Sequence, residues 1–252
     1  MSSTNHQKAG LFRLLERIDL QLLLSFLAIL LLVLLFRQIA NWIDAGATDR
    51  IDTELLRLCR DDTPEMNPRG SPRFVGAVRD FTALGSGTVL TLLVLTVSLF
   101  YFLQQRWRTG LFLLVTSTLG WGLMEWIKDV YARPRPTVVS HLVAESSYSF
   151  PSGHAKMSAV VYLTLGAILA QRSRRRSVKV FWISLAIVLT LCIGCTRVYL
   201  GVHHPSDVLA GWVAGTCWAL FVFLIARLWR DRQRLLPWKK PFTESKPTVG
   251  AG

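Results

Sequence analysis

Six long runs without charged side chains constrain the fold of this 252-residue chain more than any other feature. A helix needs roughly 20 mostly apolar residues to cross a bilayer, with a range of about 17–25. Two of the runs are shorter, and they can span only if Glu125, Lys128 and Lys156 lie near the membrane interface or in a protein-lined cavity. The pattern predicts an all-α membrane protein, a bundle of six transmembrane helices, from the runs 20–36, 81–105, 109–124, 157–171, 180–196 and 208–226.

Composition supports this class and argues against others. Hydrophobic residues make up 51% of the chain, and the mean hydropathy is +0.37. The net charge of +13 is spread over short segments between the apolar runs, so we expect contact with anionic lipid headgroups and no nucleic-acid partner. The pair Cys192 and Cys195 lies in an apolar stretch with no second ligand pair nearby, and we interpret both as small packing residues inside the bundle.

The distribution of lysine and arginine predicts the orientation of the bundle. The terminal segments and the loops 105–109 and 171–179 hold 17 of these residues, whereas the opposite side holds 12. Because short, densely basic loops stay in the cytoplasm, we expect both termini on the cytoplasmic side of a bacterial plasma membrane. The segments 128–156 and 197–207 then lie on the outer side. The first run has no small-residue cleavage site after it, so we interpret it as a retained anchor and not as a signal peptide.

For the outward segment 37–80 and the C-terminal tail, the sequence predicts only a short helix and a disordered end. The stretch "RIDTELLRLCR" places Ile51, Leu55 and Leu58 on one helical face, which predicts a helix lying at the membrane interface. A cluster of proline and glycine in 64–72 ends it. We expect one membrane domain over 1–236 and a disordered cytoplasmic tail over 237–252.

The chemistry-bearing residues lie in the outward segments. In "SFPSGHA" a Pro-Ser-Gly turn opens an apolar run, and the free N–H groups at a helix start can bind an anion. His203 and Asp207 are four residues apart at another helix start, a spacing that lets the carboxylate orient the imidazole. Taken singly, each feature also has a purely structural explanation: a helix-breaking loop for the first, a structural His–Asp pair for the second, and snorkelling for Lys128 and Arg135.

Together these residues form an ordered set of three motifs within 128–207. The set is K-x6-RP from Lys128 to Pro136, PSGH from Pro151 to His154, and TR-x5-H-x3-D from Thr196 to Asp207. In order and spacing it resembles the three-part signature of the type 2 phosphatidic acid phosphatase superfamily, membrane branch. The third motif of that family usually begins with serine, and here Thr196 keeps the hydroxyl group.

The resemblance implies a metal-independent lipid phosphatase without a cofactor, working through a phosphohistidine. His203 would be the nucleophile, Asp207 would orient it, and His154 would protonate the leaving oxygen. The phosphate would be bound by Lys128, Arg135, Ser152, Gly153 and Arg197. Arg133 and His204 stand beside the matched positions, and we interpret them as neighbours of the site or as surface residues.

A site at the outer membrane surface meets lipids and not cytoplasmic sugar phosphates. We therefore expect long isoprenyl pyrophosphates such as undecaprenyl pyrophosphate as first substrates, phosphatidic acid and phosphatidylglycerophosphate after them, and negligible cleavage of glucose 6-phosphate. Two alternatives remain open at this point: a lipid phosphotransferase with the same site, and a non-enzymatic lipid transporter, although transporters bury their charges near the bilayer midplane. The sequence does not specify an oligomeric state.

Overall fold

The computed structural model describes residues 3–63, 66–145 and 147–235, and the side chains within 20–229 of these ranges. Within them the regular structure is helical, apart from one isolated bridge between Arg60 and Pro68. The helices are α1 (Ser3–Asp44), α2 (Asp49–Leu58), α3 (Pro72–Thr82), η1 (Ala83–Gly85), α4 (Gly87–Leu103), α5 (Trp107–Tyr131), α6 (Gly153–Ser158), η2 (Ala159–Leu163), α7 (Thr164–Arg172), α8 (Arg176–Tyr199) and α9 (Pro205–Leu235).

Six membrane spans account for the six apolar runs. Five stretches are long and apolar enough by themselves to cross a bilayer: Leu20–Asp44, Trp107–Tyr131, Gly153–Arg172, Arg176–Tyr199 and Pro205–Trp229. The sixth is a bent pair, Pro72–Gly85 followed by Gly87–Leu103, with 48° between its halves. The all-α, six-span bundle predicted from the sequence is thus confirmed.

The bend in this second span has a local cause. Ser86 is extended and caps α4, because its hydroxyl oxygen accepts a hydrogen bond from the Val89 N–H at 3.3 Å. Ser71 caps α3 in the same way, accepting from the Phe74 N–H at 3.2 Å. Each half therefore begins as a separate helix, and the run predicted over 81–105 divides between α3, η1 and α4.

The two short runs reach spanning length by burying their charged neighbours in protein. Lys156 is fully buried on α6, and its ammonium group donates to the Gly120 carbonyl of α5 at 3.2 Å. Lys128 is buried at the end of α5, whereas Glu125 stays exposed. The protein-lined environment that the sequence required for the two lysines is present, so the spans extend to 107–131 and 153–172.

Close packing brings α6 against α9. A Cβ atom on Gly211 would lie 2.8 Å from the Ser152 carbonyl oxygen, and one on Gly215 would lie 2.4 Å from the Lys156 carbonyl oxygen. Only glycine allows such an approach of the two helices. This packing places the start of α6 beside the start of α9, the two helix ends that carry the predicted histidines.

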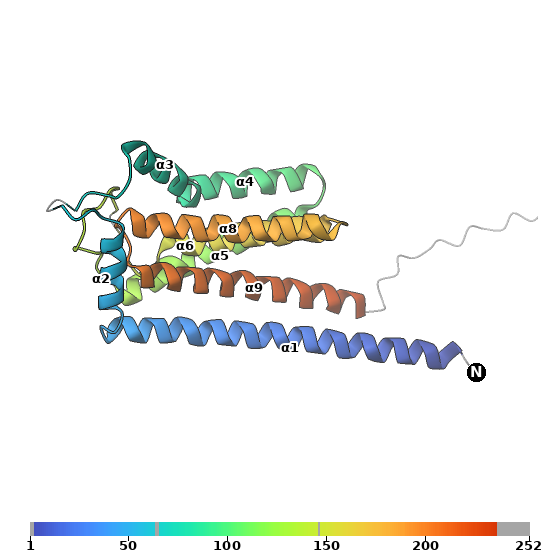
Figure 1. Ribbon diagram of the computed structural model, residues 1–252. Helices are drawn as coiled ribbons and strands as arrows, with labels where there is room; N and C mark the ends of the chain where they lie inside the picture. Colours follow the sequence, from blue (N-terminus) through green and yellow to red (C-terminus); the bar gives the residue numbers. More distant parts are fainter. Residues whose placement is uncertain (1–2, 64–65, 146, 236–252) are drawn as a thin grey trace, which may run out of the picture.

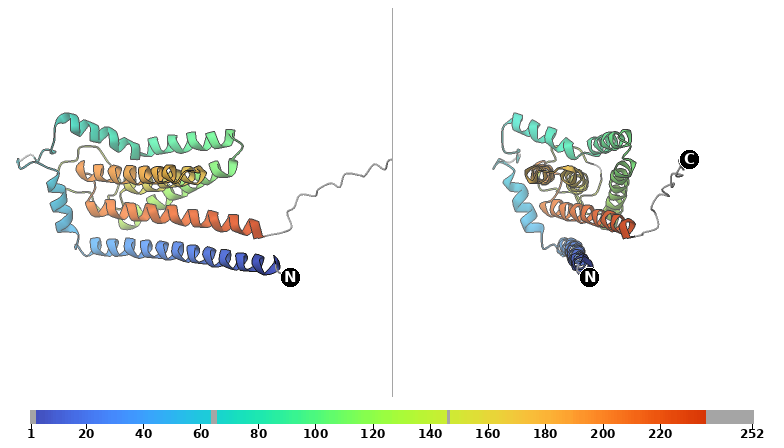
Figure 2. Two further views of the ribbon diagram at one scale, coloured as in Figure 1. Left: turned by 45° about the vertical axis from the view of Figure 1, so that its right-hand side comes forward. Right: turned by 90° about the vertical axis from the view of Figure 1, so that its right-hand side faces the viewer.

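The long helices form a bundle: α1 packs against α9 at one edge, and at the opposite edge α3 packs against α8 and α4 against α5 (Figure 1). The short helix α2 crosses one end of the bundle, the end that also bears the loops 59–71 and 132–152. The N-terminus and the end of α9 lie at the opposite end, as the turned views also show (Figure 2). The site segments are therefore separated by the length of the bundle from the start of α1 and the end of α9.

Two expectations meet different outcomes here. Cys192 and Cys195 are exposed on α8 and unpaired, so the interpretation as packing residues inside the bundle is wrong: both lie on the side of α8 that faces away from the protein, whereas Ile193 and Gly194 between them are buried. The helix predicted in the outward segment is present as α2, and Ile51, Leu55 and Leu58 are exposed on it. The predicted tail 237–252 lies outside the described residues.

Candidate active site

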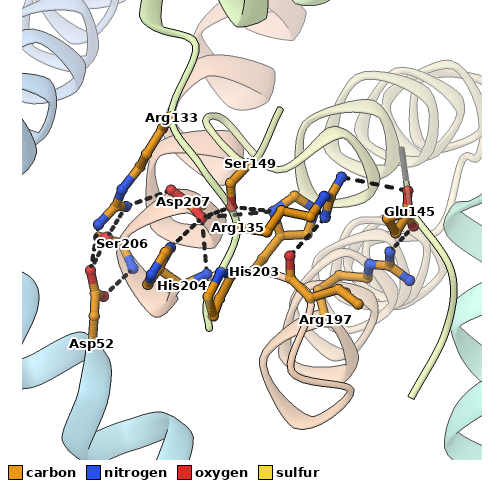
Figure 3. A network of polar contacts seen from close by, with 12 residues as sticks. Asp52, Arg133, Arg135, Glu145, Ser149, Arg197, His203, His204, Ser206 and Asp207 are labelled. Atoms are coloured by element: carbon orange, nitrogen blue, oxygen red, sulfur yellow. Dashed lines mark hydrogen bonds and ion pairs between the residues drawn. The ribbon is translucent and has the colours of Figure 1, made fainter. Parts of the chain in front are cut away.

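Residues of the first and third motifs meet at the end of the bundle crossed by α2 (Figure 3), and the Ser152 N–H of the second motif donates to the Asp207 carbonyl at 3.0 Å. The loop after α5 supplies Arg133 and Arg135, α8 supplies Arg197, and the turn into α9 supplies His203 and Asp207. Their burial is unusual for charged groups, with 2% of His203, 1% of Arg197 and none of Asp207 exposed. Buried charges must be paired and hydrogen-bonded to be tolerated, so the contacts of each group decide what the cluster can do.

The carboxylate of Asp207 lies beside the His203 ring. The distance from its Oδ2 to His203 Nδ1 is 3.7 Å, and Ser149 stands between them. The Ser149 hydroxyl donates to Asp207 Oδ2 at 2.5 Å and lies 3.4 Å from His203 Nδ1. The backbone N–H of His204 donates to the same oxygen at 2.9 Å, and the first turn of α9 also favours a negative charge here. This arrangement favours the His203 tautomer with its proton on Nδ1 and a lone pair on Nε2.

Burial sets the charge state of His203. It lowers the pKa of this imidazole to about 4, against the opposing effect of the Asp207 carboxylate, and the Arg135 and Arg197 cations act in the same direction as burial. The ring is therefore neutral at pH 7. Its Nε2 atom lies 3.3 Å from Arg135 Nη1, so a nucleophilic nitrogen faces a cationic group that can hold a phosphate.

The predicted phosphate-binding cations are held by the loop 132–152 and its neighbours. Arg135 donates from Nε to the Ser147 carbonyl at 2.8 Å and from Nη1 to the Val202 carbonyl at 2.7 Å. Lys128 Nζ donates to the Ser147 hydroxyl at 2.8 Å. Arg197 donates to Thr82 Oγ1 at 3.2 Å and pairs with Glu145. Burial lowers the pKa of Arg135, with Glu145 opposing the shift.

Ser152 and Gly153 complete the predicted cradle. A Cβ atom on Gly153 would stand 3.1 Å from Met124 Sδ and 3.8 Å from Lys128 Nζ, so glycine leaves room for a ligand beside the lysine. The Ser152 hydroxyl is fully buried and has no hydrogen-bond partner among the described residues. A buried hydroxyl without a hydrogen-bond partner destabilises the fold unless a ligand supplies the partner. A phosphate oxygen can accept the hydrogen bond of this hydroxyl.

His154 lies in the first turn of α6, at the edge of this cluster. Its ring interacts electrostatically with the Arg197, Lys128 and Arg135 cations and with His203. Its Cδ2 atom lies 3.2 Å from the point where a Cβ on Gly85 would stand, so η1 packs against it. The structure thus brings His154 into the same group of side chains as the other seven residues predicted from the sequence: Lys128, Arg135, Ser152, Gly153, Arg197, His203 and Asp207.

Sequence reasoning missed three acidic or hydroxyl side chains of the site. Glu145 pairs with Arg197 and lies 3.5 Å from Arg135, Ser149 contacts Asp207, and Asp52 reaches the start of α9 from α2. Arg133, interpreted as a neighbour of the site, pairs with Asp207 at 2.6 Å. Apart from the approach of Glu145 to Arg135 within one loop, these contacts have no local sequence signal, because each joins segments far apart in the chain.

No metal-ligand cluster accompanies these groups: among the residues whose placement is described, no three His, Cys, Asp or Glu side chains gather in a way that could hold an ion. The carboxylates of Asp207, Glu145 and Asp52 each pair with an arginine, and the remaining polar side chains are cations, hydroxyls and histidines, a set that suits an anionic ligand. The fold and the site together define a polytopic membrane protein with a buried, cationic histidine site at one end of its helices.

Comparison with known proteins assigns this class to a family. A model of the PAP2 superfamily matches residues 109–231. Phosphatidylglycerophosphatase B of Bacillus subtilis is 38% identical over 152 residues, which cover 57% of this chain and 70% of that protein. The undecaprenyl-diphosphatase of Sulfolobus acidocaldarius is 33% identical over 132 residues, or 50% of this chain and 59% of that protein. The chain belongs to the PAP2 superfamily.

Solved structures agree with this assignment. The crystal structure of a transmembrane PAP2 phosphatidylglycerolphosphate phosphatase from Bacillus subtilis superposes with a TM-score of 0.71 at 26% identity, covering 84% of this chain and 98% of that one. LpxE from Aquifex aeolicus superposes with a TM-score of 0.50, also at 26% identity, covering 68% and 93%. The architecture is therefore that of the transmembrane PAP2 phosphatase from Bacillus subtilis, and the two curated relatives described above are phosphatases by name.

Proposed function

We propose that this protein hydrolyses phosphate or pyrophosphate groups of membrane lipids through a phosphohistidine on His203. The observation that carries the proposal is the neutral, buried His203 ring, with Asp207 on its Nδ1 side and Arg135 at its Nε2 atom. A neutral imidazole held in one tautomer beside fixed cations has what nucleophilic attack on a phosphate ester requires.

The reaction follows from the positions of the side chains. Lys128, Arg135 and Arg197 bind the phosphoryl oxygens and stabilise the charge of the transition state. His203 Nε2 attacks phosphorus as the bond to the leaving oxygen breaks, and His154 donates a proton to that oxygen. The leaving group of this first step is the lipid alcohol of a monoester or the lipid monophosphate of a pyrophosphate. A water molecule then attacks the phosphohistidine, gives its proton to His154, and releases inorganic phosphate and free His203.

An apolar groove supports a lipid substrate. It has a volume of about 480 Å³ and lies between α4, α5 and the span that starts with α6. Met157, one turn beyond His154, lines it, and so do Leu90, Val94, Leu114, Trp121 and Val161. A hydrocarbon chain in this groove would bring its phosphate to the level of the histidines.

The substrate order proposed is long isoprenyl pyrophosphates before phosphatidic acid. Two relatives support a lipid phosphatase: one is named an undecaprenyl-diphosphatase and the other a phosphatidylglycerophosphatase. The second candidate, hydrolysis of phosphatidylglycerophosphate, is favoured by the match to phosphatidylglycerophosphatase B and by the structural match covering 98% of the Bacillus subtilis phosphatase.

An extracytoplasmic site is part of the proposal. The loops of the site lie at the opposite end of the bundle from the start of α1 and the end of α9 (Figure 1). The excess of lysine and arginine in the terminal segments and in the loops at their end supports a cytoplasmic location for that end. The site would then meet lipid headgroups of the outer leaflet.

One assay tests the proposal. Purified protein in mixed micelles is given a long isoprenyl pyrophosphate, phosphatidylglycerophosphate, phosphatidic acid or glucose 6-phosphate, and released phosphate is measured, with His203→Gln as the matched control. We expect the first lipid to be cleaved best and glucose 6-phosphate least. If phosphatidylglycerophosphate is cleaved faster than the isoprenyl pyrophosphate, the proposed substrate order is wrong. Transfer of the phosphate to an added alcohol would identify a phosphotransferase. If the protein releases phosphate from none of the lipids, the proposed function is refuted.

A further inference from the structure

Helix α2 lies outside the region matched by the PAP2 model, yet it sends a buried carboxylate to the site. Asp52 is 2% exposed. Its Oδ1 accepts a hydrogen bond from the Ser206 N–H at 2.9 Å, and its Oδ2 accepts one from the Ser206 hydroxyl at 2.5 Å. The same Oδ2 lies 3.1 Å from Arg133 Nη2.

Arg133 connects this carboxylate to Asp207. Its Nη1 donates to Asp207 Oδ1 at 2.6 Å and to the Ser206 hydroxyl at 2.9 Å (Figure 3). One guanidinium group thus joins two buried carboxylates, and Ser206 closes the ring between them. A planar guanidinium is well suited to such a bridge because its donors point in fixed directions.

The rotation of the Asp207 carboxylate depends on this bridge. Ser149 and His204 both donate to Oδ2, the oxygen facing His203, whereas Arg133 holds Oδ1. If Arg133 moved, the carboxylate could turn about its Cβ–Cγ bond and take Oδ2 away from His203. Asp52 is the partner that fixes the other edge of Arg133.

We propose that Asp52 is a positioning residue, which acts through Arg133 to hold the Asp207 carboxylate toward His203. This inference rests on the proposed function, since it assigns Asp207 the task of orienting the nucleophile. Asp49, on the same helix, lies 3.9 Å from Arg133 Nη2 but is 71% exposed, so water screens it and it cannot replace Asp52. Helix α2, which precedes the residues 109–231 matched by the PAP2 model, therefore helps to position the nucleophile.

Substitution Asp52→Asn is the first test, because it keeps the shape and an acceptor for the Ser206 N–H but removes the charge that holds Arg133. We expect kcat on the preferred lipid to fall about 10- to 100-fold with little change in KM, as misplacement of a reacting group does. Glu54→Gln is the matched control: it is 60% exposed on α2 and pairs with Arg50, and its kcat should equal that of the wild type.

A double variant tests the route. In an Arg133→Gln background the connection to Asp207 is already lost, so Asp52→Asn should reduce kcat little further. Additive losses would show that Asp52 acts by another route and would overturn the inference. If Asp52→Asn does not fold, Arg133→Lys tests the same link: it keeps the charge, loses the fork that joins the two carboxylates, and should lower kcat to a similar extent.

A measurement without substrate separates this inference from the proposed function. The chain has five histidines, so ¹⁵N-histidine labelling in detergent gives few signals, and His203→Gln assigns one of them. We expect His203 to carry its proton on Nδ1 in the wild type and to exchange between tautomers in Asp52→Asn. Unchanged His203 signals in both Asp52→Asn and Arg133→Lys would overturn the inference, whereas a wild-type protein that releases no phosphate would refute only the function.

Discussion

The charge state of His203 should make the enzyme active well below neutral pH. Protonation of the ring removes the lone pair that attacks phosphorus, so kcat/KM falls as the pH drops through the pKa of this group. Burial lowers that pKa from 6.5 to about 4. Lowering the pH from 7 to 5 should therefore protonate only a small fraction of the His203 rings.

The size of the effect follows from the shift. The difference between 6.5 and about 4 corresponds to about 3 kcal/mol in favour of the neutral ring. At pH 5 a ring with a pKa of 4 is still about 90% neutral, whereas one with an unperturbed pKa is only about 3% neutral. From pH 7 to pH 5, the loss of active nucleophile is thus about 10% in the buried site and about 25-fold in an exposed one.

The assay is phosphate release in mixed micelles across this pH range. The substrate also titrates, with a second phosphate pKa of about 6, and this limb must be separated from that of the enzyme. Two lipid monoesters with different second pKa values serve this purpose, because the substrate limb moves between them and the His203 limb does not. An enzyme limb near 6.5 for both substrates would refute the reasoning.

The same shift predicts how stability depends on pH. Between pH 6.5 and about 4 the unfolded chain binds a proton at His203 that the folded protein does not, so the free energy of unfolding falls as the pH falls through this window. The loss from this group approaches about 3 kcal/mol at the lower end. His203→Gln removes the titrating ring, and its stability should fall less on acidification when both proteins are unfolded in the same detergent.

Three further predictions concern the nucleophile, metals and topology. His203→Ala should abolish phosphate release while the protein still elutes as a folded species, and near-normal release would show that another group attacks; His154→Ala should do less harm when the leaving group is already acidic. Activity should survive a strong chelator and be inhibited by vanadate, which takes up the five-coordinate geometry of phosphoryl transfer; a loss that Mg²⁺ restores would mean that a metal takes part. With native cysteines removed, Ser245→Cys, at a position outside the described residues, should resist an impermeant thiol reagent in intact cells, and labelling from outside would reverse the orientation.

Local features of the chain were sufficient to predict the spans and the motif residues. Each run of uncharged residues is contiguous, and burying an apolar run in a bilayer requires no knowledge of its neighbours. The motifs are also short segments, and their order and spacing resemble the signature of the family, whereas each motif alone also fits a structural role. For this reason Lys128, Ser152, His154 and His203 could be named before their contacts were known.

The tertiary structure decided which charges the site contains. Asp52 and Ser206 are separated by 154 positions, and Glu145 and Arg197 by 52, so no local pattern connects them. In the sequence Asp52 belongs to a short charged helix, and such charges normally face water. Only the crossing of α2 over the end of the bundle buries this one.

The same distinction explains the second span and the exposed cysteines. A serine in an apolar run is compatible with a continuous helix, and the cap that Ser86 makes with Val89 became visible only in the folded backbone. Cys192 and Cys195 are apolar enough for either the interior or the lipid, and the rotation of α8 about its axis turned both outward. Hydrophobicity determined that these segments leave water. Packing against neighbouring helices determined which side of each one faces the protein, because a lipid tail is about as apolar as a protein interior.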